Sequence, residues 1–196
     1  MSDFVDPWPE RKCHAEPVRV VADQFVQVIN DAADERPAQQ FLAEHPELLG
    51  SLLQPGNGAW AFDRPTLGSQ YIPDFLLCTH TSTGYRWAMV ELESPVTKIL
   101  TAAKLPARKL NEALGQIRDW RAWIRKNIAY AQTELGFRDL DAECPAFIVI
   151  GRRSQITQDC VTRYRELSTS DTTVMTYDRL FESISNGRPH GVQGNE

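Results

Sequence analysis

Three acidic residues stand at the ends of two predicted strands, where their spacing suits metal-assisted chemistry. Asp74 follows Pro73 at the start of an apolar run, and Glu91 and Glu93 end the next such run with Leu92 between them. Residues i and i+2 of a strand share a face, so Glu91 and Glu93 point the same way, and in a tight hairpin Asp74 lies across from them. Three carboxylates on one face repel one another unless a hard divalent cation neutralises them. The pattern is therefore typical of a Mg²⁺ or Mn²⁺ site, and such a cation can activate water for attack on a phosphodiester.

A simpler interpretation of the same spacing stays open. Acidic residues are common at strand ends. In this interpretation Glu91 and Glu93 are solvated residues at the rim of the sheet, and Asp74 is a turn residue after proline. Whether the three carboxylates meet depends on the strands and helices that hold them.

The first part of the chain is expected to be helical. Apolar residues recur at helical spacing over about 18–35 and predict an amphipathic helix. Pro37 suits the first turn of a second, short helix, and Pro46 begins a further turn. A Pro-Gly-Asn-Gly cluster at 55–58 then closes a helical block that we place at residues 17–54.

Strands and helices follow one another through the rest of the chain. The predicted strands are 60–67, 71–79, 85–92, 146–151 and 172–176. A polar, glycine-containing turn joins the second and third strands into a hairpin, and this hairpin carries the three acids. Three helices are predicted in this part of the chain. The longest covers 106–132, the second begins after its N-cap residue Ser154, and the third covers 177–185. This order predicts an α/β fold with one central mixed sheet flanked by helices.

Length and composition fit one globular domain. The chain has 196 residues, of which 42% are hydrophobic and 24% charged. We place the domain at residues 17–186, with its core at 58–186 after the helical N-terminal extension. Prolines and mixed charge predict an irregular arm over residues 1–16, and residues 187–196 are expected to form a disordered tail.

Cysteine spacing and hydropathy exclude several classes of protein. Neighbouring cysteines are at least 16 residues apart and form no Cys-x-x-Cys pair, so neither a disulfide framework nor a zinc knuckle is indicated. The N-terminus is acidic and broken by proline, unlike a signal peptide, and no apolar run reaches the roughly 18 residues of a membrane span. We therefore expect a cytoplasmic protein with no membrane partner.

The charge of the chain is unevenly distributed. The net charge of −5 does not indicate a nucleic-acid-binding protein, but residues 98–126 hold eight basic residues against two acidic ones. Such a segment favours a face that binds phosphates, although a solvated helix surface also carries arginines. The residues expected to contact nucleic acid are Lys98, Lys104, Lys109, Arg118, Arg121 and Arg125.

The tryptophans of the predicted long helix allow different functions. Core packing of Trp120 and Trp123 is favoured over stacking on nucleic-acid bases. A further hypothesis makes this helix a surface that binds another protein.

Short sequence motifs resemble a known nuclease superfamily. IPDFLL at 72–77, followed by a hairpin and VELESP at 90–95, resembles the PD-(D/E)xK nucleases. With FLAEHPELL at 41–49, QIRDWRAWI at 116–124 and FIVIGRR at 147–153, the chain is more narrowly similar to the C-terminal nuclease domain of the Shedu anti-phage defence proteins over about residues 37–180. The resemblance implies a restriction-endonuclease-like core and a Mg²⁺-dependent DNA nuclease. It also implies assembly into a homo-oligomer, with a defence-system partner as a further possibility.

The resemblance assigns roles to the acidic residues. Asp74 and Glu91 match the metal-binding acids of the superfamily, while Glu93 stands where most relatives have lysine. Some restriction endonucleases of the superfamily function with glutamate there, so Glu93 would be a third ligand. Otherwise a lysine reaches the site from elsewhere, the candidates being Lys98, Lys104 and Lys109, or the fold has lost cleavage and only binds nucleic acid or a defence partner.

The resemblance also points to residues outside the hairpin. Gln116, one helical turn before Trp120, resembles the Gln-x-x-x-Tyr helix motif in which the glutamine lies beside the metal site. Relatives sometimes supply an additional carboxylate from the first helical block, and Glu44 and Glu47 are the candidates in this chain.

Overall fold

A five-stranded mixed sheet forms the centre of the protein. The computed structural model describes residues 7–13 and 19–186, so the predicted tail at 187–196 lies outside the described residues. The strands are β1 (Ala59–Asp63), β2 (Phe75–Thr81), β3 (Gly84–Leu92), β4 (Ala146–Val149) and β5 (Thr172–Met175). They lie in the sheet in chain order. β1, β2 and β3 pair antiparallel, whereas β3 pairs with β4, and β4 with β5, in parallel.

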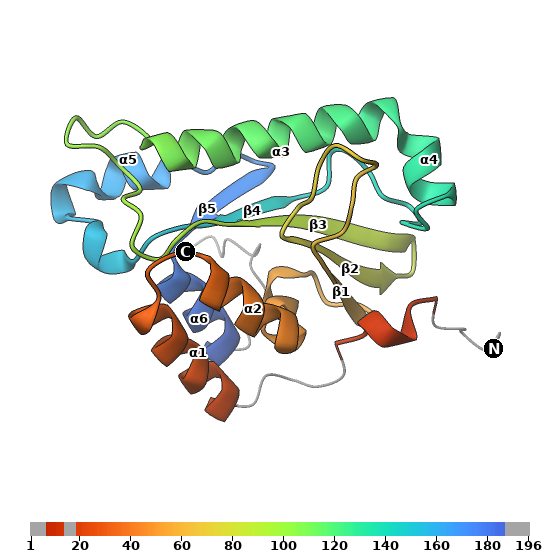
Figure 1. The fold of residues 1–196 in the computed structure, drawn as a ribbon, viewed down its shortest axis with the longest axis horizontal. Coiled ribbons are helices and arrows are strands. Elements are labelled where there is room, and N and C mark those ends of the chain that lie inside the picture. The colour runs from red at the N-terminus through yellow and green to blue at the C-terminus, as the bar shows by residue number, and fades with distance from the viewer. Residues whose placement is uncertain (1–6, 14–18, 187–196) are drawn as a thin grey trace.

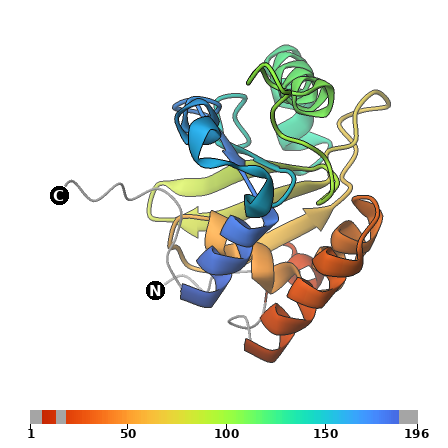
Figure 2. The same ribbon diagram turned by 90° about the vertical axis from the view of Figure 1, so that its left-hand side faces the viewer.

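Helices cover both faces of this sheet (Figures 1 and 2). The α-helices are α1 (Arg19–Asp31), α2 (Arg36–Glu44), α3 (Arg108–Lys126), α4 (Ile128–Thr133), α5 (Val161–Arg165) and α6 (Tyr177–Asn186), and the short 3₁₀ turns are η1 (Pro9–Arg11), η2 (Pro46–Leu52), η3 (Arg153–Gln155) and η4 (Gln158–Cys160). The long α3 crosses one face, and α1, α2 and α6 lie against the other (Figure 1). The expected α/β architecture with one central sheet is therefore confirmed.

Alternation along the strands divides the apolar side chains between two cores. Trp87 and Met89 of β3 pack in the core beneath α3, whereas Ala88 and Val90 pack in the core that α1, α2 and α6 cover. Because the side-chain period of a strand is two, Glu91 belongs to the α3 face. The two cores hold the sheet from both sides and fix the strand register that positions the acids.

The long predicted helix and the helix that follows β4 differ from expectation. The predicted helix at 106–132 is interrupted at Asn127, which leaves helical geometry with φ −121° and whose side-chain Nδ2 donates to the carbonyl of Trp123 at 2.8 Å. A polar side chain that bonds its own backbone competes with helix continuation, and a second helix starts after it. Ser154 does not cap a helix either: η3 and η4 come first, and α5 begins only at Val161.

Part of the predicted N-terminal arm is packed against the sheet. Trp8 contacts the rings of Trp60, Phe62, Tyr85 and Trp87, with centroids 5.1–5.9 Å apart. The backbone N–H of the arm's Cys13 donates to the carbonyl of Ala59 at 2.8 Å. Residues 7–13 thus cover the β1 edge of the sheet. Among the described residues, no helix combines the length and the apolar character needed to cross a membrane.

Gly151 joins the end of β4 to two segments that border the acidic residues. Its N–H donates to the carbonyl of Ser94, and its own carbonyl accepts from the N–H of Tyr177, each at 3.2 Å. The φ of Gly151 is +64°, and a Cβ at this position would lie 2.7 Å from the carbonyl oxygen of Thr97. Only glycine meets both conditions without strain.

We expect Gly151→Ala to lower the free energy of unfolding by about 1–3 kcal/mol, because alanine there is strained in backbone and in packing. Urea denaturation measures the change. Gly50→Ala is the matched control, since a Cβ at Gly50 meets nothing within 4 Å, and its stability should stay close to that of the parent protein. Equal stabilities of Gly151→Ala and the parent would contradict the role of Gly151.

Candidate active site

Asp74 and Glu91 form a carboxyl pair where the β2–β3 hairpin ends. Phe75 of β2 pairs with Val90 of β3, so Asp74 lies opposite Glu91 in the same register. The two side chains are hydrogen-bonded to each other. Asp74 Oδ2 also accepts the N–H of Leu92 at 2.8 Å, which fixes the carboxyl group against the end of β3.

Burial sets the protonation of this pair. Burial raises the pKa of Glu91 to about 9, and the charges of Asp74 and Glu93 add to the increase. Burial also raises the pKa of Asp74 to about 6, while the hydrogen bond from Leu92 and the charge of Arg64 oppose that increase. The pair therefore shares one proton near neutral pH.

Glu93 is held by a lysine from α3. Its side chain is buried, and Glu93 Oε2 lies 3.6 Å from the Nζ atom of Lys109. Burial raises the pKa of Glu93 and the Lys109 charge opposes the increase, whereas the Glu93 charge raises the pKa of Lys109. Of the three lysines considered from the sequence, Lys109 reaches the acidic cluster, while Lys104 pairs with Asp159 at 3.0 Å.

The same helix brings Gln116 to the pair. Gln116 follows Lys109 by two helical turns, so both lie on one side of α3. Its side chain acts on Glu91 and opposes the increase in the pKa of that carboxyl group. Trp120 and Trp123 are buried in the core beneath α3, as the packing interpretation predicts.

Glu35 is a carboxylate of the N-terminal block that acts on the cluster and that the sequence analysis missed. Its charge acts on Asp74, Glu93 and Lys109. Glu44 accepts a hydrogen bond from Gln40 instead. No local pattern distinguishes Glu35, which simply precedes α2 as its N-cap residue.

Two tertiary contacts bring the start of α2 to the site. Gln39 Nε2 of α2 donates to Asp63 Oδ1 at the end of β1, at 2.7 Å. Ser94 Oγ, directly after Glu93, donates to the carbonyl of Ala33 at 3.4 Å. These bonds link segments far apart in the chain. The other candidate, Glu47, pairs with the ring of His45 at 3.3 Å.

Arg64 is a second residue that sequence reasoning missed. It has a φ of +44°, which is uncommon for a residue with a side chain. Its N–H donates to the carbonyl of Asp74 at 2.8 Å, and its charge lowers the pKa of Asp74. The Arg64 side chain is exposed to solvent. The only sequence signal is its place between a strand and Pro65.

The basic residues expected to contact nucleic acid fall into different groups. Arg121 is buried, and its guanidinium donates to Asp171 Oδ2 at 2.6 Å and to the carbonyl of Cys144 at 3.2 Å, so it ties α3 to the sheet rather than facing solvent. Arg125 pairs with Glu143 at 2.6 Å. Lys98 and Arg118 are exposed.

The donor set of the cluster fits a hard divalent cation held by two carboxylates. Asp74 and Glu91 supply adjacent carboxyl oxygens, the ligand type that Mg²⁺ and Mn²⁺ prefer, and Mg²⁺ usually keeps several waters beside one or two carboxylates. Within residues 7–13 and 19–186, no three or more His, Cys, Asp or Glu side chains are gathered as a ready metal cage. Glu93, the third acid of the expected arrangement, pairs with Lys109.

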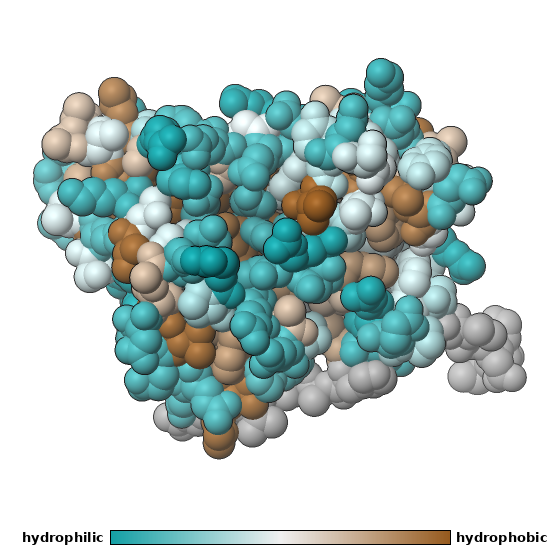
Figure 3. All heavy atoms as spheres, viewed as in Figure 1, coloured by the Kyte–Doolittle hydropathy of each residue, from teal (hydrophilic) through white to brown (hydrophobic). Residues whose placement is uncertain are grey.

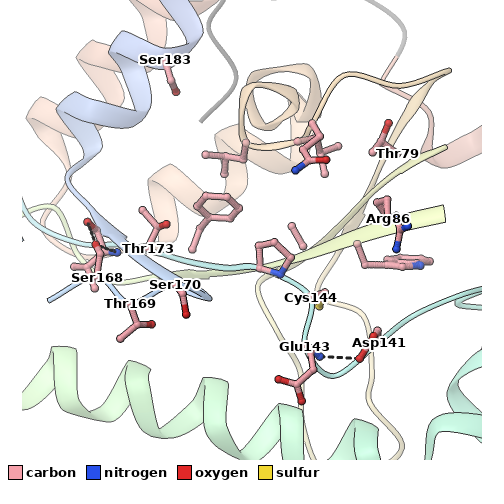
Figure 4. Close-up of a pocket in the computed structure, with 18 of the residues that line it drawn as sticks. Thr79, Arg86, Asp141, Glu143, Cys144, Ser168, Thr169, Ser170, Thr173 and Ser183 are labelled. Atoms are coloured by element: carbon pink, nitrogen blue, oxygen red, sulfur yellow. Dashed lines mark hydrogen bonds between the residues drawn. The ribbon is translucent and has the colours of Figure 1, made fainter. Parts of the chain in front are cut away.

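A cavity of about 1030 Å³ lies elsewhere, near the N-terminal ends of β4 and β5. Figure 4 shows its lining: Asp141 and Glu143 come from the loop before β4, Ser168 to Ser170 precede β5, and Ser183 projects from α6. Neither Asp74 nor Glu91 lines this cavity. The acidic cluster and this cavity are therefore separate features of the protein.

The surface does not favour the protein-interaction hypothesis. The two tryptophans on which that hypothesis rested are buried. On the face drawn in Figure 3, hydrophobic residues are scattered among hydrophilic ones rather than joined into one large patch.

Comparison with known proteins identifies a family. The family described as "Shedu protein SduA, C-terminal" matches residues 32–181. That range includes Glu35, both members of the carboxyl pair, Lys109 and Gln116. Among curated proteins, none matches the chain.

Without divalent cations, the stability of the protein should decrease as pH rises from about 5 to about 8. Glu91 has an ordinary pKa of 4.5 when unfolded and about 9 when folded, so between these values unfolding releases a proton and is favoured by higher pH. We expect Glu91→Gln to remove most of this decrease and to be more stable than the parent by about 1–3 kcal/mol at pH 8. Urea denaturation in EDTA at several pH values measures it.

Glu10→Gln, at an exposed position in η1, is the control and should keep the parent's dependence on pH. A Glu91→Gln protein with the same dependence would show that Glu91 titrates normally.

Proposed function

Since this chain belongs to the Shedu family, matching the C-terminal part of the SduA protein, we propose that it is a Mg²⁺- or Mn²⁺-dependent DNA nuclease of anti-phage defence. The observation that carries the proposal is the pairing of buried Glu91 with half-buried Asp74, with Gln116 and Lys109 beside them. Burying two adjacent carboxyl groups opposes folding unless a ligand uses them. We further propose, from the resemblance, a cytoplasmic homo-oligomer that can act with another defence component.

The order of elements supports a PD-(D/E)xK core. Helices precede three meandering strands, and a long helix leads to the first of two parallel strands. Asp74 directly before β2 and Glu91 near the end of β3 have the spacing expected of that superfamily's motif, which supports the proposal.

Asp74 and Glu91 are the residues that would hold the cation, with the carbonyl of Leu92 as a further oxygen ligand. A bound divalent cation supplies charge neutralisation, polarisation of a phosphate oxygen and a lowered pKa for water. Gln116 orients the Glu91 carboxylate. Arg64, which is exposed, binds the phosphate that is attacked, and exposed Lys98 and Arg118 hold neighbouring phosphates of DNA.

In this proposal Lys109 supplies the positive charge that the motif lysine supplies in most relatives. Glu93 stands at the motif position on the strand, and its carboxylate holds the ammonium group of Lys109 from α3. The positive charge is then supplied by a helix rather than by the strand, and it stabilises negative charge that develops on the phosphate. Engagement of Glu93 by Lys109 supports this arrangement over a three-acid cage.

Incubation of the protein with plasmid DNA tests the proposal. The parent should cleave in Mg²⁺ or Mn²⁺ and not in EDTA, and Asp74→Asn should lose about 100-fold or more of that activity. The asparagine still accepts the N–H of Leu92, so the fold is preserved. Glu10→Gln should cleave like the parent. Binding of DNA without cleavage by the parent would instead support the alternative of a nuclease fold that only binds.

Lys109→Met should lower the cleavage rate by about 100-fold, because a charge that stabilises the transition state is lost. Affinity for DNA at moderate salt should change little, as one charge among several is removed. Filter binding and cleavage kinetics separate the two effects. The neighbouring Arg108 is exposed and pairs with Glu112, so Arg108→Met is the matched control and should keep the parent's rate. Equal cleavage rates for Lys109→Met and Arg108→Met would contradict the proposed role of Lys109 in stabilising the transition state.

A further inference from the structure

A groove runs along the C-terminal half of α3. It has a volume of about 850 Å³ and lies between the loop that joins β1 to β2 and the helices α3 and α4. The loop lies beside α3 in both ribbon views (Figures 1 and 2). Gly68 and Tyr71 line the groove from the loop, and Trp123, Lys126 and Tyr130 line it from the helices.

Close packing gives this groove a fixed shape. Gly68 has a φ of +62°, and a Cβ at this position would lie 3.0 Å from Cζ2 of Trp123, so the backbone of the loop packs against the indole ring. The N–H of Leu67 donates to the carbonyl of Tyr71 at 2.8 Å and closes the loop, and Leu67 itself is fully buried. The groove is therefore preformed, as sites for ligands usually are.

Tyr130 presents an aromatic ring at this groove. Its ring contacts that of Trp123 in an edge-to-face arrangement, with centroids 6.3 Å apart and an angle of 76° between the planes. Tyr130 is 46% exposed, whereas Trp123 is only 9% exposed. A ring that is held by a neighbour and open to solvent can stack on another planar group, and nucleobases are the planar groups that a DNA nuclease meets.

The polar side chains around the groove favour an anionic ligand. Lys126 and Arg118 are exposed, and neither forms an ion pair within the part of the chain that the structure describes. Arg118 Nη2 would lie 3.9 Å from a Cβ at Gly115, on the stretch of α3 that leads from the acidic cluster to the groove. Among the described residues that line the groove, Asp119 is the only acid. Two cations against one acid suit a phosphate, and the exposed amide of Gln70 can bond the edge of a base.

Helix α3 connects this groove to the acidic cluster. Lys109, Gln116 and Trp123 recur every seven residues and therefore lie along one side of α3. From Gln116 to Trp123 the helix rises about 10 Å, which equals roughly three steps of a DNA strand at about 3.4 Å each. The loop makes a second connection, because the N–H of Arg64 near its start donates to the carbonyl of Asp74 at its end. A strand bound at the cluster therefore reaches the groove about three nucleotides away.

Stacking on Tyr130 requires a base that has left the double helix. Both faces of an internal paired base are covered by its neighbours, whereas an unpaired base has a free face. We propose that this groove binds an unpaired nucleotide of the DNA substrate, with its base stacked on Tyr130 and its phosphate beside Lys126. The inference rests on the proposed nuclease function and names its substrate class, which is DNA with an unpaired nucleotide about three positions from the cleaved bond.

Filter binding in EDTA tests the inference with two probes, a fully paired duplex and the same duplex with a central run of mismatched bases. The parent should bind the mismatched duplex about 5-fold or more tightly than the paired one, and Tyr130→Ala should lose this preference, because stacking on the ring is lost. The same preference should appear in kcat/KM for cleavage in Mn²⁺. Tyr130→Phe keeps an aromatic ring and should keep the preference. Ile128→Ala is the matched control, since Ile128 is 42% exposed on α4 and does not line the groove.

The possible results separate this inference from the proposed function. A parent that cleaves DNA but treats the two probes alike overturns the inference alone, and so does a Tyr130→Ala protein that keeps the parent's preference. A parent that neither binds nor cleaves DNA overturns the proposed function, and the inference with it. Analytical ultracentrifugation covers a protein ligand: a changed number of subunits in Tyr130→Ala with an unchanged preference for mismatched DNA makes the groove a contact between copies and overturns the inference.

Discussion

The buried hydrogen bond between Asp74 and Glu91 is the interaction on which the rest of the site depends. Burial of Glu91 and partial burial of Asp74 favour one shared proton over two negative charges on these adjacent carboxyl groups. Neighbouring groups reduce the unfavourable free energy of placing these carboxyl groups together. Leu92 donates its N–H to Asp74, Gln116 acts on Glu91, and Lys109 neutralises the third acid.

Strand register makes this pair possible, and two packed layers make the register unique. A slip of one residue between β2 and β3 would carry Asp74 to the opposite face, together with the apolar side chains that alternate along both strands. Those side chains are buried in separate cores, so the slip would expose both. The loss of stability that would follow a register shift therefore comes from exposure of the two cores and not from the acids. This explains how an unfavourable carboxyl pair is maintained.

The sequence predicts what lies within a hairpin or along one helix face, and little of what tertiary packing adds. Asp74 and Glu91 could be placed together because a pleated strand has a fixed period, whereas Gln116 was suggested by the resemblance of its helix to the Gln-x-x-x-Tyr motif. Glu35 is brought near the cluster by contacts between segments far apart in the chain, such as that of Ser94 with Ala33, which no local pattern records. Arg121 was expected to contact nucleic acid because of its charge, but its guanidinium is buried. The sequence does not distinguish a buried arginine from a solvated one.

Unfavourable features gather at one end of the sheet, and their coincidence argues for function. Besides the carboxyl pair, Arg64 has a left-handed backbone conformation, and Tyr177 buries a hydroxyl that has no hydrogen-bond partner among the described residues. Each feature opposes folding, and substitutions that remove any of them are easy to reach. A protein selected for stability alone would lose them independently. In the nuclease that we propose, an oxygen-rich anion bound together with a divalent cation would offset the cost of the carboxyl pair and of the Arg64 backbone.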